Sequence, residues 1–224
     1  MNPLLTINTI SKYYKGICAL DKVSIDVEKG AIYGIVGPNG SGKTTLLSII
    51  SGVKAQTSGA INTNSVRIGA LIEAPIFYDY MTAIQNLRLI AHLRDDKDSD
   101  LLKILQIVRL EKQCNKKFRD FSLGMKQRLG IAGTLIGKPD LIILDEPTNG
   151  LDPLGIIEIR DIILELQANG ITLLIASHLL FEIEKICTHI IVMKEGKLLY
   201  KGSMEEFLIN HIKAEDALIS ILKI

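Results

Sequence analysis

Apolar residues recur along this chain in two periods, which predict strands and helices respectively. Residues 4–10 and 19–27 alternate apolar and polar positions, a pattern typical of half-buried antiparallel strands. Residues 31–36, 141–144 and 172–176 are short and almost wholly apolar, as in parallel strands that are buried on both faces. The pattern therefore predicts an α/β protein with a mainly parallel sheet and an antiparallel β subdomain at its start.

Helical spacing of apolar residues dominates between about 80 and 137. Helices are expected over 83–93, over 101–110 and from 125 to about 136. This block reads as an α-helical subdomain inserted in a single domain that spans residues 1–224.

The other elements follow from local signals. A turn region is expected over 57–65, before a strand over 66–72, and Glu195-Gly196 marks a hairpin turn. The remaining helices are expected over 45–53, 153–168, 181–187 and, as one or two short helices, about 203–224.

Composition and charge narrow the classes of function. The 224 residues include 26 Lys plus Arg against 25 Asp plus Glu, so the chain lacks the basic excess of most nucleic-acid-binding proteins. Cys18, Cys114 and Cys187 are far apart, which indicates reduced thiols and no metal-binding pair. There is no signal-peptide pattern and no apolar run near the ~18 residues of a membrane helix. We therefore expect any membrane role to come through a partner chain.

Residues 37–44 read GPNGSGKT and fit the phosphate-binding pattern G-x-x-x-x-G-K-[ST] at every required position. The glycines let successive N–H groups point into one concavity, Lys43 reaches the β- and γ-phosphates, and the Thr44 hydroxyl is placed to bind Mg²⁺. A strand precedes this P-loop and a helix follows it, so the positive end of the helix dipole also favours an anion. The segment predicts nucleotide binding.

Polar residues follow the later buried strands. Asp145 and Glu146 end one of them, at the edge where open α/β sheets place their ligands. Asp145 would hold Mg²⁺ opposite Thr44, while Glu146 would orient and deprotonate the attacking water. His178, at the end of the next strand, could hydrogen-bond the γ-phosphate. Tyr14 could stack on adenine or merely cover the sheet, and spacing alone leaves both readings open.

Four further segments carry a resemblance to a known family. They are residues 122–128 (SLGMKQR, the signature segment), 145–148 (DEPT), 150–152 (GLD) and 177–178 (SH). Together with the P-loop, they make the chain similar to the ATP-binding subunits of ABC transporters over nearly its whole length. The Asn-Lys-x-Asp tetrad of guanine-specific proteins is not completed, because residues 115–118 read NKKF.

The resemblance implies that two such subunits pair head to tail and enclose two ATP molecules. Each ATP would touch the P-loop of one subunit and the signature segment of the other, where Ser122 donates a hydrogen bond and Gly124 permits close approach. Asp152 would lie in the turn that links the two sites, and Tyr14 would stack on adenine. Closing of this dimer would drive a separate membrane-spanning permease, docked near residues 73–80, at the cytoplasmic face of a bacterial membrane.

These expectations assign residues to three roles. Catalysis is assigned to Lys43, Glu146 and His178; the metal to Thr44, Asp145 and Glu73; and ATP contacts to Tyr14, Gly37, Pro38, Asn39, Gly40, Ser41, Gly42, Lys43, Thr44, Thr45, Ser122, Gly124 and Asp152.

The chain departs from the family pattern at a few positions. Glu73 stands where the family usually has glutamine, which places a negative charge beside phosphate. This charge could weaken ATP retention, tune coupling, or be a harmless substitution. Leu123 and Met125 replace a glycine and a glutamine of the commoner signature. Residues 68–75, with Phe77-Tyr78, resemble the branch that exports bacitracin or lantibiotics in self-protection or resistance.

Two alternatives remain within the family. A soluble ATPase acting on ribosomes usually carries two cassettes in one chain, and one acting on chromosomes carries a long coiled coil; neither feature is present in this sequence. A regulatory ATP sensor would be expected to lack the base or the switch histidine, whereas Glu146 and His178 are both present.

Overall fold

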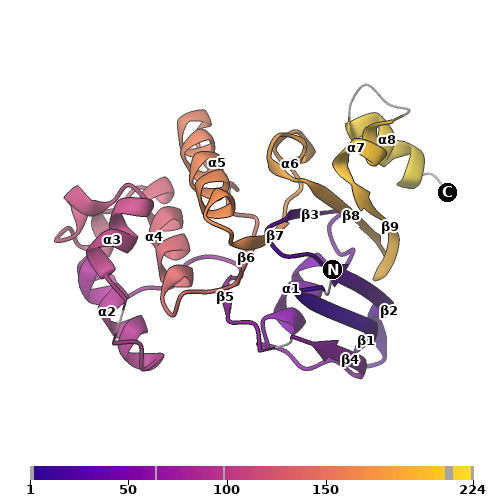
Figure 1. Ribbon diagram of the computed structural model, residues 1–224, viewed down its shortest axis with the longest axis horizontal. Coiled ribbons are helices and arrows are strands. Elements are labelled where there is room, and N and C mark those ends of the chain that lie inside the picture. Colours follow the sequence, from indigo (N-terminus) through magenta and orange to yellow (C-terminus); the bar gives the residue numbers. More distant parts are fainter. Residues whose placement is uncertain (1–2, 64, 98, 210–213, 223–224) are drawn as a thin grey trace.

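The computed structural model describes residues 3–63, 65–97, 99–209 and 214–222 of the chain (Figure 1). Within these ranges the strands form two sheets, one of three strands and one of six. The strands are β1 (Leu5–Tyr14), β2 (Ile17–Val27), β3 (Ile32–Val36), β4 (Ser58–Asn62), β5 (Ile68–Leu71), β6 (Leu141–Asp145), β7 (Thr172–Ala176), β8 (His189–Lys194) and β9 (Lys197–Ser203). The α-helices are α1 (Lys43–Ile50), α2 (Ala83–Leu93), α3 (Leu101–Ile107), α4 (Leu123–Leu135), α5 (Pro153–Ala168), α6 (Leu180–Ile186), α7 (Met204–Leu208) and α8 (Ala214–Leu222).

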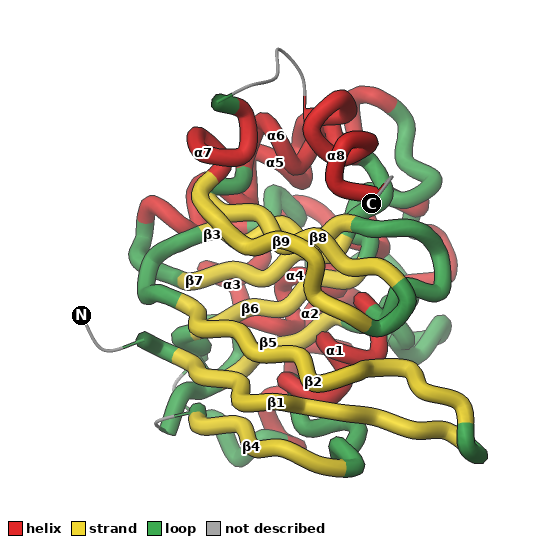
Figure 2. Tube along the Cα trace, turned by 90° about the vertical axis from the view of Figure 1, so that its right-hand side faces the viewer, coloured by secondary structure: helices red, strands yellow, loops and turns green. Residues whose placement is uncertain are grey.

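The six-stranded sheet has the order β5-β6-β7-β3-β8-β9 and is the centre of the molecule (Figure 2). Every neighbouring pair is parallel except β8 and β9, which form the hairpin expected around Glu195-Gly196. All residues of β3, β6 and β7 are buried. The mainly parallel sheet predicted from these apolar runs is confirmed.

Alternation along the central strands sends side chains into two separate cores. Ile142 and Leu144 of β6 belong to the core shared with helices α2 to α8. Leu141 and Ile143 face the opposite core, which also contains residues of α1, β1 and β2. The parallel sheet is thus covered on both faces, as its continuous hydrophobic strands require.

The antiparallel sheet has the order β2-β1-β4, so a strand that follows the P-loop helix joins two that precede it. The prediction of a turn region over 57–65 was wrong over β4. This strand is short, polar and mostly exposed, and it lacks apolar alternation. It pairs with β1 through Thr6↔Asn62 and Ile7↔Ile61 as an edge strand of the sheet. The extended conformation of β4 therefore depends on a partner strand that is distant in sequence.

Helices α2, α3 and α4 lie together at one end of the molecule, away from the antiparallel sheet (Figure 1). Local capping sets where they begin: Thr82 and Gln85 form a capping box, Asp100 caps α3, and Ser122 caps α4. The expected helix over 83–93 is confirmed. The helix expected over 101–110 ends earlier, at Ile107.

The C-terminal segment packs against the edge of the large sheet. Helices α7 and α8 lie near β9, and the Lys194 ammonium donates a 2.8 Å hydrogen bond to the Leu222 carbonyl. The short helices expected over about 203–224 are therefore present, although residues 210–213 and 223–224 of that range lie outside the described residues. None of the described helices is long and apolar enough to cross a bilayer.

Candidate nucleotide-binding site

The P-loop connects the buried strand β3 to helix α1. Gly42, the residue before α1, has a φ of 101°, a left-handed conformation that glycine adopts without strain. A Cβ at this position would lie 2.8 Å from the Ala19 carbonyl oxygen. Glycine is therefore needed here both for the turn and for the close approach of β2.

The loop encloses a cavity of about 300 Å³ at the N-terminus of α1. The unpaired N–H groups of the first helical turn and the helix dipole make this end of α1 favourable for an anion. Ser41 Oγ is buried and has no hydrogen-bond partner among the described residues, so a polar ligand would satisfy it. The lining residues are Ala19, Asn39, Gly40, Ser41, Gly42, Lys43, Thr44, Thr45 and Glu146.

Lys43 is 7% exposed, and its ammonium donates to the carbonyls of Gly37 at 2.8 Å and Pro38 at 3.1 Å. Burial lowers the pKa of Lys43, while the negative charges of Glu146 and Asp145 oppose that shift. A phosphate group would add further negative charge and favour the ammonium. The buried cation therefore suits a polyanionic ligand.

Asp145 ends β6 and is also buried. Burial raises the pKa of its carboxyl group; the charges of Glu146 and Glu73 add to this shift, whereas a hydrogen bond from Thr44 and the charge of Lys43 oppose it. Its Oδ1 has no hydrogen-bond partner within the part of the chain that the structure describes. A cation bound at this oxygen would relieve both the burial cost and the missing partner.

The side-chain oxygens at this end of the cavity fit a Mg²⁺ ion that also binds the phosphate oxygens of a nucleotide. The described residues hold no group of three His, Cys, Asp or Glu side chains that could bind a metal by themselves. Mg²⁺ commonly takes one or two protein oxygens and completes its shell with phosphate oxygens and water. Thr44 and the unpartnered Asp145 oxygen match that need.

Glu146 and His178 are brought together although 32 positions separate them. The His178 Nδ1 lies 2.7 Å from Glu146 Oε2, and the His178 backbone N–H donates to the same oxygen at 3.3 Å. Glu146 has a φ of 51°, and its N–H donates to Ala176 in the neighbouring strand. Such a conformation in a non-glycine residue persists where the surrounding structure enforces it, and here it holds the carboxylate at the P-loop cavity.

The signature segment and the turn at Asp152 are not among the lining residues of this cavity. Ser122 Oγ accepts from the Met125 N–H at 3.3 Å at the start of α4. Asp152 Oδ1 accepts from Gly155 at 2.7 Å at the start of α5. Both side chains act as helix caps, and the Ser122 O–H can still donate to a ligand. Within one chain, they do not complete the P-loop site.

Tyr14 and Glu73, two other residues predicted for the site, are not among the residues that line the P-loop cavity. Tyr14 is 39% exposed, and the ammonium groups of Lys12 and Lys54 lie over its ring, 5.1 and 5.9 Å from the ring centre. Glu73 is exposed, has a φ of 64°, and acts on Asp145 through its charge. Stacking of Tyr14 on adenine and metal binding by Glu73 remain predictions.

Sequence reasoning missed how the hairpin turn supports the P-loop. The Gly196 N–H donates to the Ser41 carbonyl, and the Gly196 carbonyl accepts from Asp21 of β2. A Cβ at Gly196 would lie 2.7 Å from the Ala19 carbonyl oxygen. The dipeptide Glu195-Gly196 signalled a turn, but nothing in the local sequence indicated its partner.

A larger hollow of about 770 Å³ lies at the opposite edge of the parallel sheet, near the start of β5 and β6. It contains the Arg67–Asp140 ion pair and mixes both signs of charge. The N-terminus of α3 lines this hollow, but the Asp100 carboxylate already accepts from the Leu102 and Lys103 N–H groups there, so size alone does not identify the nucleotide site.

Comparison with known proteins agrees with this geometry. The family model described as ABC transporter matches residues 20–149, more than half of the chain. A model described as an AAA domain, putative AbiEii toxin of a type IV toxin–antitoxin system, matches the shorter range 115–184. The lantibiotic transport ATP-binding protein SrtF of Streptococcus pyogenes is 39% identical over 226 residues, covering 95% of this chain and 99% of SrtF. The bacitracin transport ATP-binding protein BcrA of Enterococcus faecalis is 41% identical, covering 92% of this chain and 71% of BcrA.

Solved structures give the same result. The structure of an ATP-binding subunit of an ABC transporter superposes with a TM-score of 0.86 at 26% identity, covering 98% of this chain and 99% of that one. An ATP-binding cassette solved as a post-hydrolysis dimer with ADP and phosphate has a TM-score of 0.79 at 26% identity, with coverage of 89% and 98%. These findings favour a transporter subunit over an ATPase acting on ribosomes or chromosomes. The chain belongs to the ATP-binding, ATP-hydrolysing subunits of ABC transporters.

Proposed function

We propose that this chain powers export of a peptide antibiotic of the lantibiotic or bacitracin type, for self-protection or resistance, through a separate membrane permease. The observation that carries the proposal is a P-loop cavity with Glu146 in its wall, in a chain 39% identical to a lantibiotic transport subunit over nearly the full length of both. The 41% identity to two bacitracin transport subunits supports the same class of cargo.

Each site residue has a distinct task in this proposal. The P-loop N–H groups and Lys43 bind the phosphates, and Glu146 takes a proton from the water that attacks the γ-phosphate. His178 orients the Glu146 carboxylate through the 2.7 Å contact and is positioned to donate to the γ-phosphate. Mg²⁺, held by Thr44 and Asp145 with Glu73 beside them, would neutralise phosphate charge.

A second copy of the chain would complete the site. Ser122, Gly124 and Asp152 are not part of the P-loop cavity of their own chain, which supports their action on the ATP of a partner. The likeness to a cassette that forms a dimer with ADP and phosphate supports the same arrangement here. We propose an identical copy as the partner, with all of residues 1–224 acting as one ATP-binding domain and Tyr14 stacking on adenine.

The permease would dock between the helical block and the sheet. Ile76 is 94% exposed, and Tyr78 and Tyr80 are also exposed nearby. A hollow of about 360 Å³ adjoins them, lined partly by Pro75, Phe77 and Ile90. Apolar side chains around a hollow suit a short helix from a membrane protein, and such docking would place this chain on the cytoplasmic face of the bacterial membrane.

Antibiotic susceptibility tests the proposal. A strain in which the chain is deleted is grown with bacitracin and with a panel of lantibiotics, and is complemented with the wild type or with Lys43→Ala. We expect the deletion to lower the inhibitory concentration for at least one of these peptides, and only the wild type to restore it. Unchanged susceptibility to all of them would contradict the proposed cargo.

A further inference from the structure

Three consecutive helices each begin at a residue of the proposed two-chain site. Ser122 caps α4, Asp152 caps α5, and His178 lies just before α6. In Figure 1 the helices follow one another as α4, α5 and α6 across one face of the parallel sheet. Ion pairs connect α5 to both of its neighbours.

The first ion pair connects α4 to α5. Arg128 Nη2 lies 3.6 Å from Glu158 Oε2, and the Arg128 side chain is only 11% exposed. Arg128 Nη1 also donates to the carbonyls of Arg109, at 3.1 Å, and Val108, at 3.4 Å, just after α3. Arg128 is the last residue of the signature segment, so the guanidinium ties this segment to two neighbouring elements.

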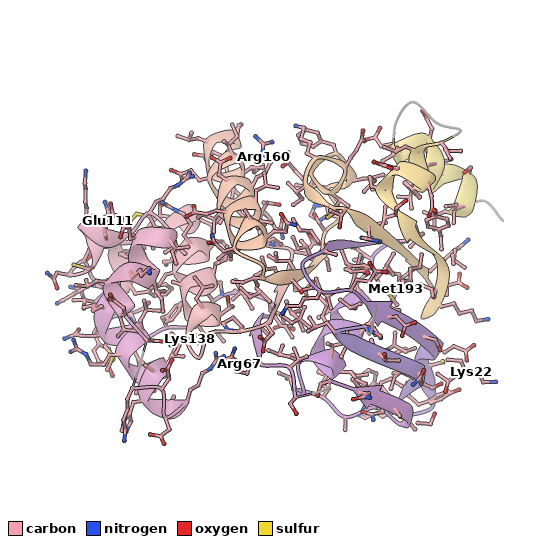
Figure 3. All side chains as sticks on the ribbon, in the orientation of Figure 1. Lys22, Arg67, Glu111, Lys138, Arg160 and Met193 are labelled. Atoms are coloured by element: carbon pink, nitrogen blue, oxygen red, sulfur yellow. The ribbon has the colours of Figure 1, made fainter. Side chains whose placement is uncertain are left out.

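The second ion pair connects α5 to α6. Arg160 Nη1 lies 3.7 Å from Glu182 Oε2, and the Glu182 side chain is 5% exposed. Figure 3 labels Arg160 beside α5, in the region between α5 and α6. Lys185 lies 3.8 Å from the other Glu182 oxygen. Residues 158 and 160 project from different sides of α5, because two residues span more than half a helical turn.

Both pairs act mainly through charge. Their distances of 3.6 and 3.7 Å exceed the roughly 2.8 Å of a short charge-assisted hydrogen bond. Arg128 Nε and Glu182 Oε2 have no hydrogen-bond partner among the described residues. The buried member of each pair, Arg128 or Glu182, costs desolvation energy, so the pairs add little net stability and their value lies in the geometry that they impose.

We propose that Arg128, Glu158, Arg160 and Glu182 form an ionic bridge across α5 that holds Ser122, Asp152 and His178 of one chain in fixed relative positions. The four are positioning residues: they touch neither phosphate nor water. Through them, Ser122 and Asp152, which face the partner's ATP, move together with His178, the switch histidine of the same chain. The inference rests on the proposed two-chain site, since Ser122 and Asp152 act only there.

The test separates assembly from binding. Glu146→Gln serves as the parent, because blocked hydrolysis should let the ATP-bound dimer accumulate. Glu158→Gln and Arg160→Gln are added singly and together. Glu158→Gln removes a charge at nearly constant size, and Arg160→Gln replaces the guanidinium with a shorter, uncharged polar side chain. Asp161→Asn is the matched control, because Arg109–Asp161 is a comparable ion pair from α5 with both side chains 43% exposed. The readouts are ATP affinity of the dilute monomer, the ATP concentration for half-maximal dimer, and the thermal unfolding midpoint.

We expect each bridge variant to raise the half-maximal ATP concentration for dimer by about tenfold, with monomer ATP affinity unchanged. Glu158→Gln should keep the unfolding midpoint, because Arg128 retains two carbonyl partners. Arg160→Gln should lower the midpoint, because the buried Glu182 then keeps only Lys185 as a charged partner among the described residues. The double variant should be non-additive, and Asp161→Asn should match the parent. In the hydrolysis-competent chain, where turnover needs the ATP-bound dimer, the same substitutions should raise the apparent KM for ATP with little change in kcat.

The outcomes distinguish two failures. A parent that stays monomeric with ATP overturns the two-chain site and the bridge with it. A parent that dimerises while both bridge variants dimerise equally well overturns the bridge alone. A loss of dimer confined to the variants whose unfolding midpoint falls assigns these residues to stability and also overturns the bridge.

Discussion

Glu146→Gln provides a strong test of the chemistry. The amide has nearly the shape of the carboxylate. Its oxygen can still accept from the His178 backbone N–H, whose nitrogen lies 3.3 Å from Glu146 Oε2 in the wild type. The backbone conformation, with φ at 51°, is set by neighbouring strands and should not change. The substitution therefore removes the base while keeping the fold of the cavity.

The magnitude follows from the lost proton transfer. General-base assistance is typically worth about 10²–10⁴-fold, which corresponds to roughly 3–5 kcal/mol in the activation barrier. ATP binding should not weaken, since Glu146 is one of two negative charges that act on Lys43 and its loss favours a triphosphate. We expect kcat to fall by about 10²-fold or more while ATP affinity is kept or improved.

Phosphate release at saturating ATP measures kcat, and titration of a fluorescent ATP analogue measures affinity. Glu195→Gln is the matched control: Glu195 is an exposed glutamate with a φ of 50°, but it lies outside the cavity lining. Its turnover should equal that of the wild type. If Glu146→Gln kept turnover within about threefold of the wild type, Glu146 would not be the base.

Four other changes probe the site and the fold. Lys43→Ala removes the buried ammonium and should weaken ATP binding by about 10- to 100-fold, the worth of hydrogen bonds to a charged group; unchanged affinity by titration would contradict the P-loop assignment. Glu73→Gln removes a negative charge that acts on Asp145, so hydrolysis or its coupling to transport should change with the unfolding midpoint preserved; identical rates would make the glutamate incidental. Gly69→Ala should cost about 1–3 kcal/mol in urea unfolding, because its Cβ would lie 2.2 Å from the Thr134 carbonyl oxygen. Gly133→Ala should be tolerated, because its Cβ would meet the end of the Ile90 side chain at 3.1 Å and the Phe77 ring at an ordinary 3.7 Å. Arg67 donates a hydrogen bond to Asp140 and lowers the pKa of that carboxyl. Arg67→Gln should therefore be less stable than the wild type near neutral pH, and this difference in stability should vanish as pH falls through the lowered Asp140 pKa. A difference that persisted in acid would rule out this pair as its cause.

Much of the site could be predicted from the sequence because its chemistry depends on short segments. The P-loop and the strand-end carboxylates Asp145 and Glu146 each depend on a few consecutive positions of chain. The wholly apolar run 141–144 indicated a parallel strand buried on both faces, and the structure confirms it as most of β6. Short sequence patterns were sufficient to predict these features, because each feature is defined by residues that are close together in the chain.

Other features exist only where distant segments meet. Strand β4 has no apolar pattern of its own and is defined by its pairing with β1. The Glu146–His178 contact and the Gly196 support of the P-loop join segments far apart in sequence. The contact between Arg128 and Glu158 exists only because α4 and α5 pack together. Sequence alone thus determined which groups are available for nucleotide chemistry, whereas packing around the parallel sheet decided which of them touch, because contact across many residues is set by the whole fold.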